Sequence, residues 1–237
     1  MKQRLLKPIS LLLLCSCLLY SVQSTAQIST AHRKSSNAYR NNYQRVFSGT
    51  NCAASFEIRA NGTLWAWGQN TSGQLGDGTT VRKSLPVPIG TDTWSIITSS
   101  LSTLGIQTDG TLWAWGNNNS GQLGDGTTVD KLTPTQIGTD NKWVAVSAGY
   151  LHSLALKADG TLWAWGNNTY GSLGDGTTVA KTTPTQIGSD NKWVSIETGR
   201  THSLALKSDG TLWAWGQNSS GQLGDGSLFA ARPIPLP

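Results

Sequence analysis

The sequence predicts an all-β protein, a small or incomplete β-propeller built from about four blades of about 50 residues and four strands each. The string Leu-Trp-Ala-Trp-Gly occurs four times and ends at Gly68, Gly116, Gly166 and Gly216. A repeat of this length is typical of propellers and solenoids. Each copy contains short segments that alternate apolar and polar residues, with no helical pattern. An Asn-Gly or Asp-Gly pair, which favours a hairpin turn, precedes every string.

Residues 1–26 have the three-part layout of a secretory signal peptide. Three basic residues come first, an apolar stretch covers 9–22, and small residues at 24–26 offer a cleavage site. About 14 apolar residues are too few for a membrane span, which needs about 20. We therefore expect a secreted protein, located in the periplasm, at the cell surface or outside the cell, with no membrane span.

Residues 27–45 form a basic leader rich in Ser and Asn, for which we expect a flexible conformation. The net charge of the whole chain is +5, and loss of the three basic residues in the signal would lower it to +2. Only 13% of the residues are charged, against about 25% in a typical soluble protein. This composition argues against a nucleic-acid partner.

The repeat domain covers residues 46–237. Its four units span about 46–90, 94–138, 143–188 and 193–237. In the third unit we expect strands at 143–147, 152–157, 161–165 and 184–187, the first two from their alternation and the third from its β-forming residues. We expect Asp159-Gly160 to form a type I′ hairpin turn. Pro86 and Pro88 place the last strand of the first unit at a sheet edge.

The paired tryptophans predict how the blades pack on one another. Residues i and i+2 of a strand share a face, so Trp65 and Trp67 project to one side and Leu64 and Ala66 to the other. A sheet with one bulky and one smaller face can stack on a copy of itself, with each Trp contributing about 150–250 Å². We expect the further Trp residues at 94, 143 and 193 to pack at the blade margin.

Several short motifs recur together in this order. In the third unit they read Gly149-x-x-His152-Ser153-Leu154-Ala155-Leu156, Asp159-Gly160, Trp165-Gly166-x-Asn168 and Gly171-x-Leu173-Gly174-x-Gly176. In these motifs the sequence resembles the regulator of chromosome condensation repeat family, as a secreted member of bacterial type. The resemblance implies a β-propeller, usually of seven blades. The best-known eukaryotic member of the family exchanges guanine nucleotide on a small GTPase and binds chromatin.

Four units are fewer than that family usually has. The sequence leaves four arrangements open: a closed four-bladed ring, an open arc, self-association of two chains to complete a ring, and a part of a longer propeller. Because the units are uniform and carry no inserted GTPase-facing loops, the exchange activity is an alternative that rests on resemblance alone.

No catalytic, cofactor or metal site is predicted. His152 and His202 occupy the same place in two units, which is typical of a structural residue rather than a general base. One Asp per unit recurs in the Gly-Asp-Gly segment, and we expect it to cap backbone amides of a turn rather than bind calcium. These four residues are Asp77, Asp125, Asp175 and Asp225.

The polar loops after each Trp pair are the predicted binding residues, because loops on a rigid scaffold commonly carry binding. The candidates are Asn70, Ser72, Asn118, Ser120, Asn168, Tyr170, Asn218 and Ser220. The hypothesis is a non-enzymatic scaffold that binds a protein or a glycan. One alternative is a guanine-nucleotide exchange factor-like regulator, and another is a carbohydrate-binding lectin.

Overall fold

The computed structural model of the chain describes residues 44–50, 52–228 and 231–236. The predicted signal peptide and nearly all of the leader lie outside these residues. Every pair of neighbouring strands in the described residues is antiparallel. The all-β prediction is confirmed. Among the described residues, no helix has the length and apolar character needed to cross a bilayer.

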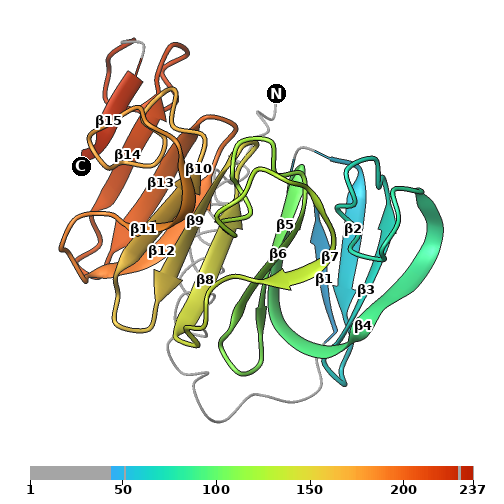
Figure 1. The fold of residues 1–237 in the computed structure, drawn as a ribbon. Coiled ribbons are helices and arrows are strands. Elements are labelled where there is room, and N and C mark those ends of the chain that lie inside the picture. Colours follow the sequence, from blue (N-terminus) through green and yellow to red (C-terminus); the bar gives the residue numbers. More distant parts are fainter. Residues whose placement is uncertain (1–43, 51, 229–230, 237) are drawn as a thin grey trace, which may run out of the picture. The chain divides into compact units, whose positions relative to one another are not determined.

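The first two blades share one long strand (Figure 1). Their strands are β1 (Arg45–Ser48), β2 (Ala54–Ile58), β3 (Thr63–Gly68), β4 (Lys83–Ser99), β5 (Ser102–Gln107), β6 (Leu112–Gly116) and β7 (Lys131–Gln136). The first part of β4 pairs with β3, and its last part, from Trp94 to Ser99, pairs with β5. The outer edge of the first blade thus continues directly into the inner strand of the second.

The third and fourth blades are separate sheets of four strands each. Their strands are β8 (Trp143–Ala148), β9 (His152–Lys157), β10 (Leu162–Gly166), β11 (Lys181–Gln186), β12 (Trp193–Thr198), β13 (His202–Lys207), β14 (Leu212–Gln217) and β15 (Ala231–Leu236). The expected four strands per unit are confirmed. The last strand of the third blade begins at Lys181, three residues earlier than its proline suggested, because Lys181 pairs with Gly166 across a bulge.

The β9–β10 hairpin lies at the predicted Asp-Gly pair but has a different turn. The Gly160 amide donates to the Lys157 carbonyl at 2.9 Å, and the Lys157 amide donates to the Thr161 carbonyl at 3.1 Å. These bonds define a three-residue loop that ends in a glycine with φ of +82°, rather than a two-residue type I′ turn. The Asp159 carboxylate accepts from the Thr161 amide and hydroxyl, which holds the loop from inside.

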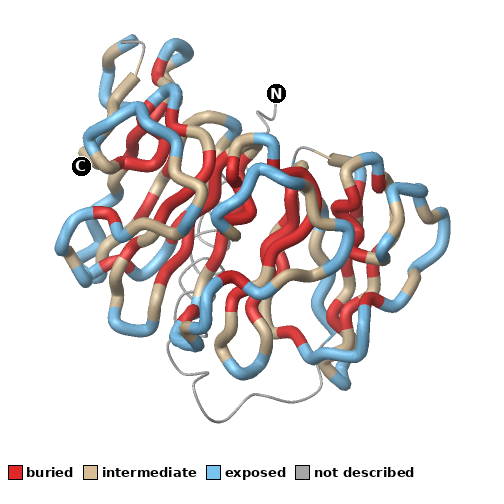
Figure 2. The backbone as a smooth tube through the Cα atoms, viewed as in Figure 1, coloured by how far each residue is buried: buried red, intermediate tan, exposed pale blue. Residues whose placement is uncertain are grey.

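The core lies between blades, as the Trp pattern predicts. The Leu64 and Ala66 face of the first blade packs against Trp94 and Trp115 of the second blade. Equivalent clusters lie at the second and third boundaries. Figure 2 shows buried positions along the middle strands and exposed positions at the turns and outer strands. The edge position of Pro86 and Pro88 is also confirmed, because this part of β4 pairs only with β3.

The third Trp of the second, third and fourth units is not at the blade margin. Trp94, Trp143 and Trp193 are 2–5% exposed and belong to the inter-blade clusters. Trp94 makes an edge contact with Trp115, with ring centroids 5.4 Å apart. The prediction was wrong because of the strand register, which pairs Trp143 with Lys157. This register brings the Trp143 ring into edge contact with the Trp163 ring, inside the Trp face.

Each blade packs on its neighbours in the sequence. Within the described strands, none of the first blade packs extensively on one of the fourth. The described residues therefore form a partial propeller of four blades rather than a closed ring.

Candidate functional site

The four predicted loop asparagines are buried and not available to a partner. Asn70, Asn118, Asn168 and Asn218 are all 0% exposed. The Asn168 amide group donates to the Asp175 carboxylate at 3.0 Å and to the Thr177 carbonyl at 3.0 Å, and its oxygen accepts from the Leu173 amide at 3.0 Å. This corrects the expectation that these side chains face a partner. They organise the loop from within, because its backbone has few partners of its own.

The aspartates of the same loops hold the turn, as predicted. Asp175 accepts from the Thr177 amide at 2.9 Å and from the Thr177 hydroxyl at 2.8 Å, and Lys181 lies 3.6 Å from its second oxygen. Burial acts to raise the pKa of Asp175, but the bonds from Thr177 and Asn168 and the charge of Lys181 outweigh burial and lower it. The carboxylate oxygens are thus committed to structure.

The other predicted loop residues differ in exposure. Ser72 and Ser120 are half-buried, and their amides donate to the side chains of Gln74 and Gln122. Ser220 is exposed, and its amide donates to the side chain of Gln222 in the same way. Tyr170 is 39% exposed. Tyr170 and Ser220 are therefore the predicted residues most accessible to a partner.

The third loop departs from the others in two linked positions. Tyr170 replaces the serine of the other loops, and Ser172 replaces the glutamine that braces them. In the second loop the Gln122 side chain also donates to Asn117 and is fully buried. Ser172 is too short to fill that space. A cavity of about 240 Å³ opens here between the third and fourth blades.

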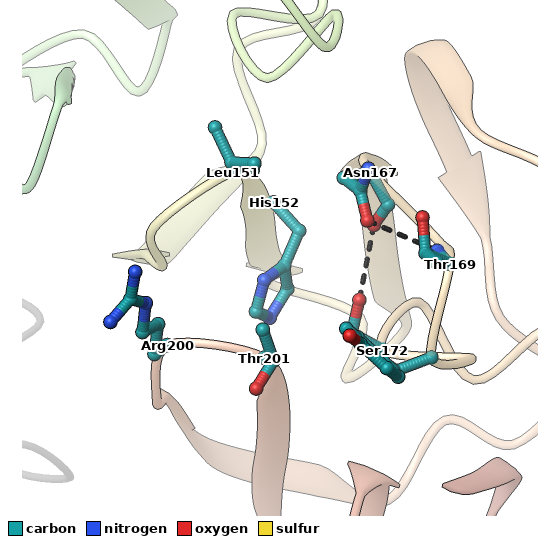
Figure 3. A pocket seen from close by; sticks show the side chains of 8 residues that line it. Leu151, His152, Asn167, Thr169, Ser172, Arg200 and Thr201 are labelled. Carbon is teal, nitrogen blue, oxygen red and sulfur yellow. Dashed lines mark hydrogen bonds between the residues drawn. The ribbon is translucent and has the colours of Figure 1, made fainter.

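This cavity is the candidate site, and two blades line it. Its lining residues are Leu151, His152, Asn167, Thr169, Tyr170, Ser172, Arg200 and Thr201. Figure 3 shows Arg200 and Thr201 on one side and Asn167, Thr169 and Ser172 on the other, with His152 between them.

The polar groups of the cavity are held in place by bonds within each blade. The Asn167 amide donates to the Leu151 carbonyl at 2.8 Å, which brings the β10–β11 loop and the β8–β9 turn to the same edge. The Ser172 hydroxyl donates to the Asn167 carbonyl at 3.0 Å. We call this edge, formed by residues 149–151, 167–180 and 199–201, the loop face.

Arg200 supplies the positive charge at the cavity. It lies in the turn between β12 and β13, and its guanidinium carbon is 4.6 Å from the centroid of the Tyr150 ring in the third blade. Such stacking orients an arginine without using its donors. Arg200 is exposed. An exposed, pre-oriented guanidinium beside tyrosines is suited to a carboxylate.

His152 forms the floor of the cavity and is structural, as predicted. Its Nε2 lies 3.0 Å from the Ser203 Oγ of the next blade, and the Ser203 hydroxyl donates to the Ser172 carbonyl at 2.8 Å. Since the hydroxyl proton is used in that bond, Nε2 carries a proton and donates to Oγ. Burial, with the charge of His202, lowers the pKa of His152 to about 4. The pair has the wrong polarity for a serine nucleophile.

Tyr150, Arg200 and Thr201 were not among the predicted binding residues. A signal was available, because the turn before each second strand differs between copies: Ser-Leu, Tyr-Leu and Arg-Thr precede positions 102, 152 and 202. In a repeat protein, such departures mark positions released from the common packing.

Stacked antiparallel blades joined through Trp faces define a repeat protein of the β-propeller class. Within that class the chain belongs to the RCC1-like domain family, whose model matches residues 24–236. The predicted family is confirmed at this level. No curated protein matches the chain.

Solved structures share the fold. Human WBSCR16 is 24% identical, with a TM-score of 0.72 over 81% of this chain and 52% of that one. Prp20p from Saccharomyces cerevisiae is 25% identical, with a TM-score of 0.70 over 81% of this chain and 49% of that one. The chain therefore spans about half the length of the structures it matches.

Proposed function

We propose that this protein is a secreted, non-enzymatic propeller module that binds a protein partner at the boundary of its third and fourth blades. The observation that carries the proposal is the cavity beside Tyr150, Tyr170 and Arg200, which lies at the loop that departs from the repeat. Tyrosine and arginine are the residue types most enriched at energetically dominant positions of protein interfaces. The stacked blades hold these groups rigidly, which lowers the entropic cost of binding.

An acidic segment of a protein is the partner that best fits the cavity. Arg200 can pair with a carboxylate while Tyr150 and Tyr170 cover its apolar neighbours. A glycan is less favoured at this cavity, because the residues that line it include no tryptophan on which a sugar could stack. A glycan array tests that alternative.

The non-enzymatic character is supported by the chemistry of His152. Its neighbour Ser203 is committed to a carbonyl, so no activated nucleophile arises from this pair. The secretory part of the proposal is supported by the layout of residues 1–26. Cell fractionation and N-terminal sequencing test it, with a mature chain beginning at Gln27 as the expected result.

The experiment for binding rebuilds the regular loop in the third blade. Tyr170→Ser with Ser172→Gln copies the second unit, so the fold should persist while the cavity fills. We expect the full chain to capture acidic peptides from a displayed peptide library, and the double variant to lose this binding. Arg200→Gln should weaken it at least tenfold. Asn119→Ala, an exposed change in the second loop, is the control. Unchanged binding by the double variant would contradict the proposal.

The family offers one competing function. The structure of Prp20p is described together with its binding to Gsp1p and histones, which is a property of that protein. This chain spans about half of it. A nucleotide-release assay with candidate GTPases separates the two ideas, since faster release would replace the scaffold proposal with an exchange role.

A further inference from the structure

The three blade boundaries share one set of bonds. At each boundary the carbonyl of the residue before the loop leucine accepts from an indole of the next blade. Trp115, Trp165 and Trp215 donate to Gln74, Gln122 and Ser172 at 2.8–2.9 Å. The same three carbonyls accept from the hydroxyls of Thr103, Ser153 and Ser203, each at 2.8 Å. A Trp face and a leucine face therefore meet in a fixed register.

A glycine admits the indole at each boundary. A Cβ atom on Gly174 would lie 2.8 Å from Trp215 Nε1, and Gly124 has the same relation to Trp165. The leucines around it are fully covered: Leu154, Leu162 and Leu173 of the third blade are 0% exposed.

The fourth blade carries the same face without a neighbour in the described residues. Gly224 would meet nothing within 4 Å, and Leu212, the counterpart of Leu162, is 58% exposed. A cavity of about 160 Å³ lies where an indole sits in the other blades, lined by Leu212, Ala214, Leu223, Gly224, Asp225, Arg232 and Leu236. We call this surface, with Leu204 and Leu206, the terminal leucine face.

A partner for this face must satisfy the register seen inside the chain. It needs a Trp opposite a Ser or Thr, as Trp215 pairs with Ser203. It also needs a small residue opposite the first Trp of the pair. Gly105, Ala155 and Ala205 hold that position in the second, third and fourth blades.

The first blade of this chain breaks the second requirement. Ser55 pairs with Trp67 as needed, but Glu57 lies opposite Trp65. The Glu57 carboxylate is 3.3 Å from Arg59, and the Arg59 guanidinium lies 3.5 Å from the centroid of the Trp65 ring. A cation over the first Trp is common to the third and fourth blades, where Lys157 and Lys207 lie 3.7 and 3.6 Å from the rings of Trp163 and Trp213. The Glu57 carboxylate is the departure, and docking this face on a leucine face would have to displace or bury it, which is costly.

We propose that the terminal leucine face is a docking surface for a Trp-bearing blade of RCC1 type that carries a small residue opposite its first Trp, and that Glu57 keeps the first blade of other copies away from it. The internal boundaries give the contacts in advance: an indole donates to the Gln222 carbonyl and fills the cavity over Gly224, and a serine hydroxyl lies beside His202. Exclusion of its own first blade prevents head-to-tail chains, which would otherwise grow without closing.

The test uses the full chain as both receptor and probe. Glu57→Ala with Arg59→Gln gives the first blade the residues of a regular Trp face. Adding Leu212→Asp, at a largely exposed position, disables the leucine face of that same chain. We expect this triple variant to be monomeric alone and to form a one-to-one complex with the wild-type chain in sedimentation velocity.

Three controls make the outcome specific. Leu212→Asp alone, which keeps Glu57, should not bind the wild type. A second triple variant carries Val179→Asp, a similar change at an exposed valine of the third loop, in place of Leu212→Asp. Its terminal leucine face should remain able to bind. Circular dichroism and thermal melting confirm that each variant is folded. A folded triple variant that forms no complex overturns the docking surface, and a wild type that already associates through Leu212 overturns the role of Glu57.

Discussion

The Nε2 atom of His152 in the third blade lies 3.0 Å from the Oγ atom of Ser203 in the fourth. This contact crosses a blade boundary and links the floor of the candidate cavity to the bond that Ser203 makes with Ser172. The contact between the third and fourth blades therefore includes an imidazole that is neutral in the folded chain.

That neutrality predicts a pH dependence of stability. The pKa of His152 falls from about 6.5 to about 4 in the folded chain, so the unfolded chain takes up the proton first. The contribution is complete above about pH 6.5 and is lost as the pH falls toward 4, with a slope of about 1.4 kcal/mol per pH unit. Urea unfolding between these pH values measures it. His152→Ser should flatten the slope, whereas His202→Ser, at the half-buried counterpart, should leave most of it.

The matched glycines separate packing from backbone strain. Gly174 and Gly224 have φ values of +79° and +72°, but only Gly174 faces an indole. We expect Gly174→Ala to lower the free energy of unfolding by about 2 kcal/mol more than Gly224→Ala. Equal losses in urea unfolding would show that backbone strain alone sets the cost.

The indole bond at the second boundary can be weighed in the same way. Trp165→Phe removes the donor to the Gln122 carbonyl and should cost about 1 kcal/mol beyond the change in ring size. Trp67, on the partly exposed Trp face of the first blade, is the comparison, and Trp67→Phe should change stability by less than about 0.5 kcal/mol. Chemical denaturation of both variants is the measurement. A larger loss of stability for Trp67→Phe would contradict the stabilising role of the indole bond at the blade boundary.

The buried side-chain amide of Asn168 should contribute more to stability than an exposed polar side chain of the same type of loop. Asn168→Ala removes one of several donors to Asp175 and takes the Asn168 side chain away from the Leu173 amide and two carbonyls, so we expect a loss of about 3 kcal/mol. Asn119→Ala, at an exposed asparagine of the second loop, should stay within about 0.5 kcal/mol. Thermal melting of the two variants ranks them, and equal melting temperatures would refute the internal role.

The repeat made the strands and their faces predictable. Trp65 and Leu64 could be assigned to opposite faces because a strand alternates, and the same argument placed Pro86 at an edge. The burial of Asn168 could not be predicted in this way, since its partners lie 5–11 residues away in a loop without periodicity. A polar residue in a loop is expected to be exposed, but the folded loop closes around the Asn168 side chain and buries it.

The candidate cavity could not be predicted from the strand pattern either, for a different reason. Ser172 and Arg200 are 28 residues apart in the sequence and meet only because the fourth blade stacks on the third. A pattern within one repeat contains no information on that contact.

Because of the long strand β4, the four blades should differ in how separately each can unfold. It closes the first blade and opens the second within one continuous run from Lys83 to Ser99, whereas short connections join the later blades. Separating the first two blades would require bending that run between the part that pairs with β3 and the part that pairs with β5. The N-terminal half of the propeller should accordingly behave as one cooperative folding unit, and the later blades as additions that can open locally before it does.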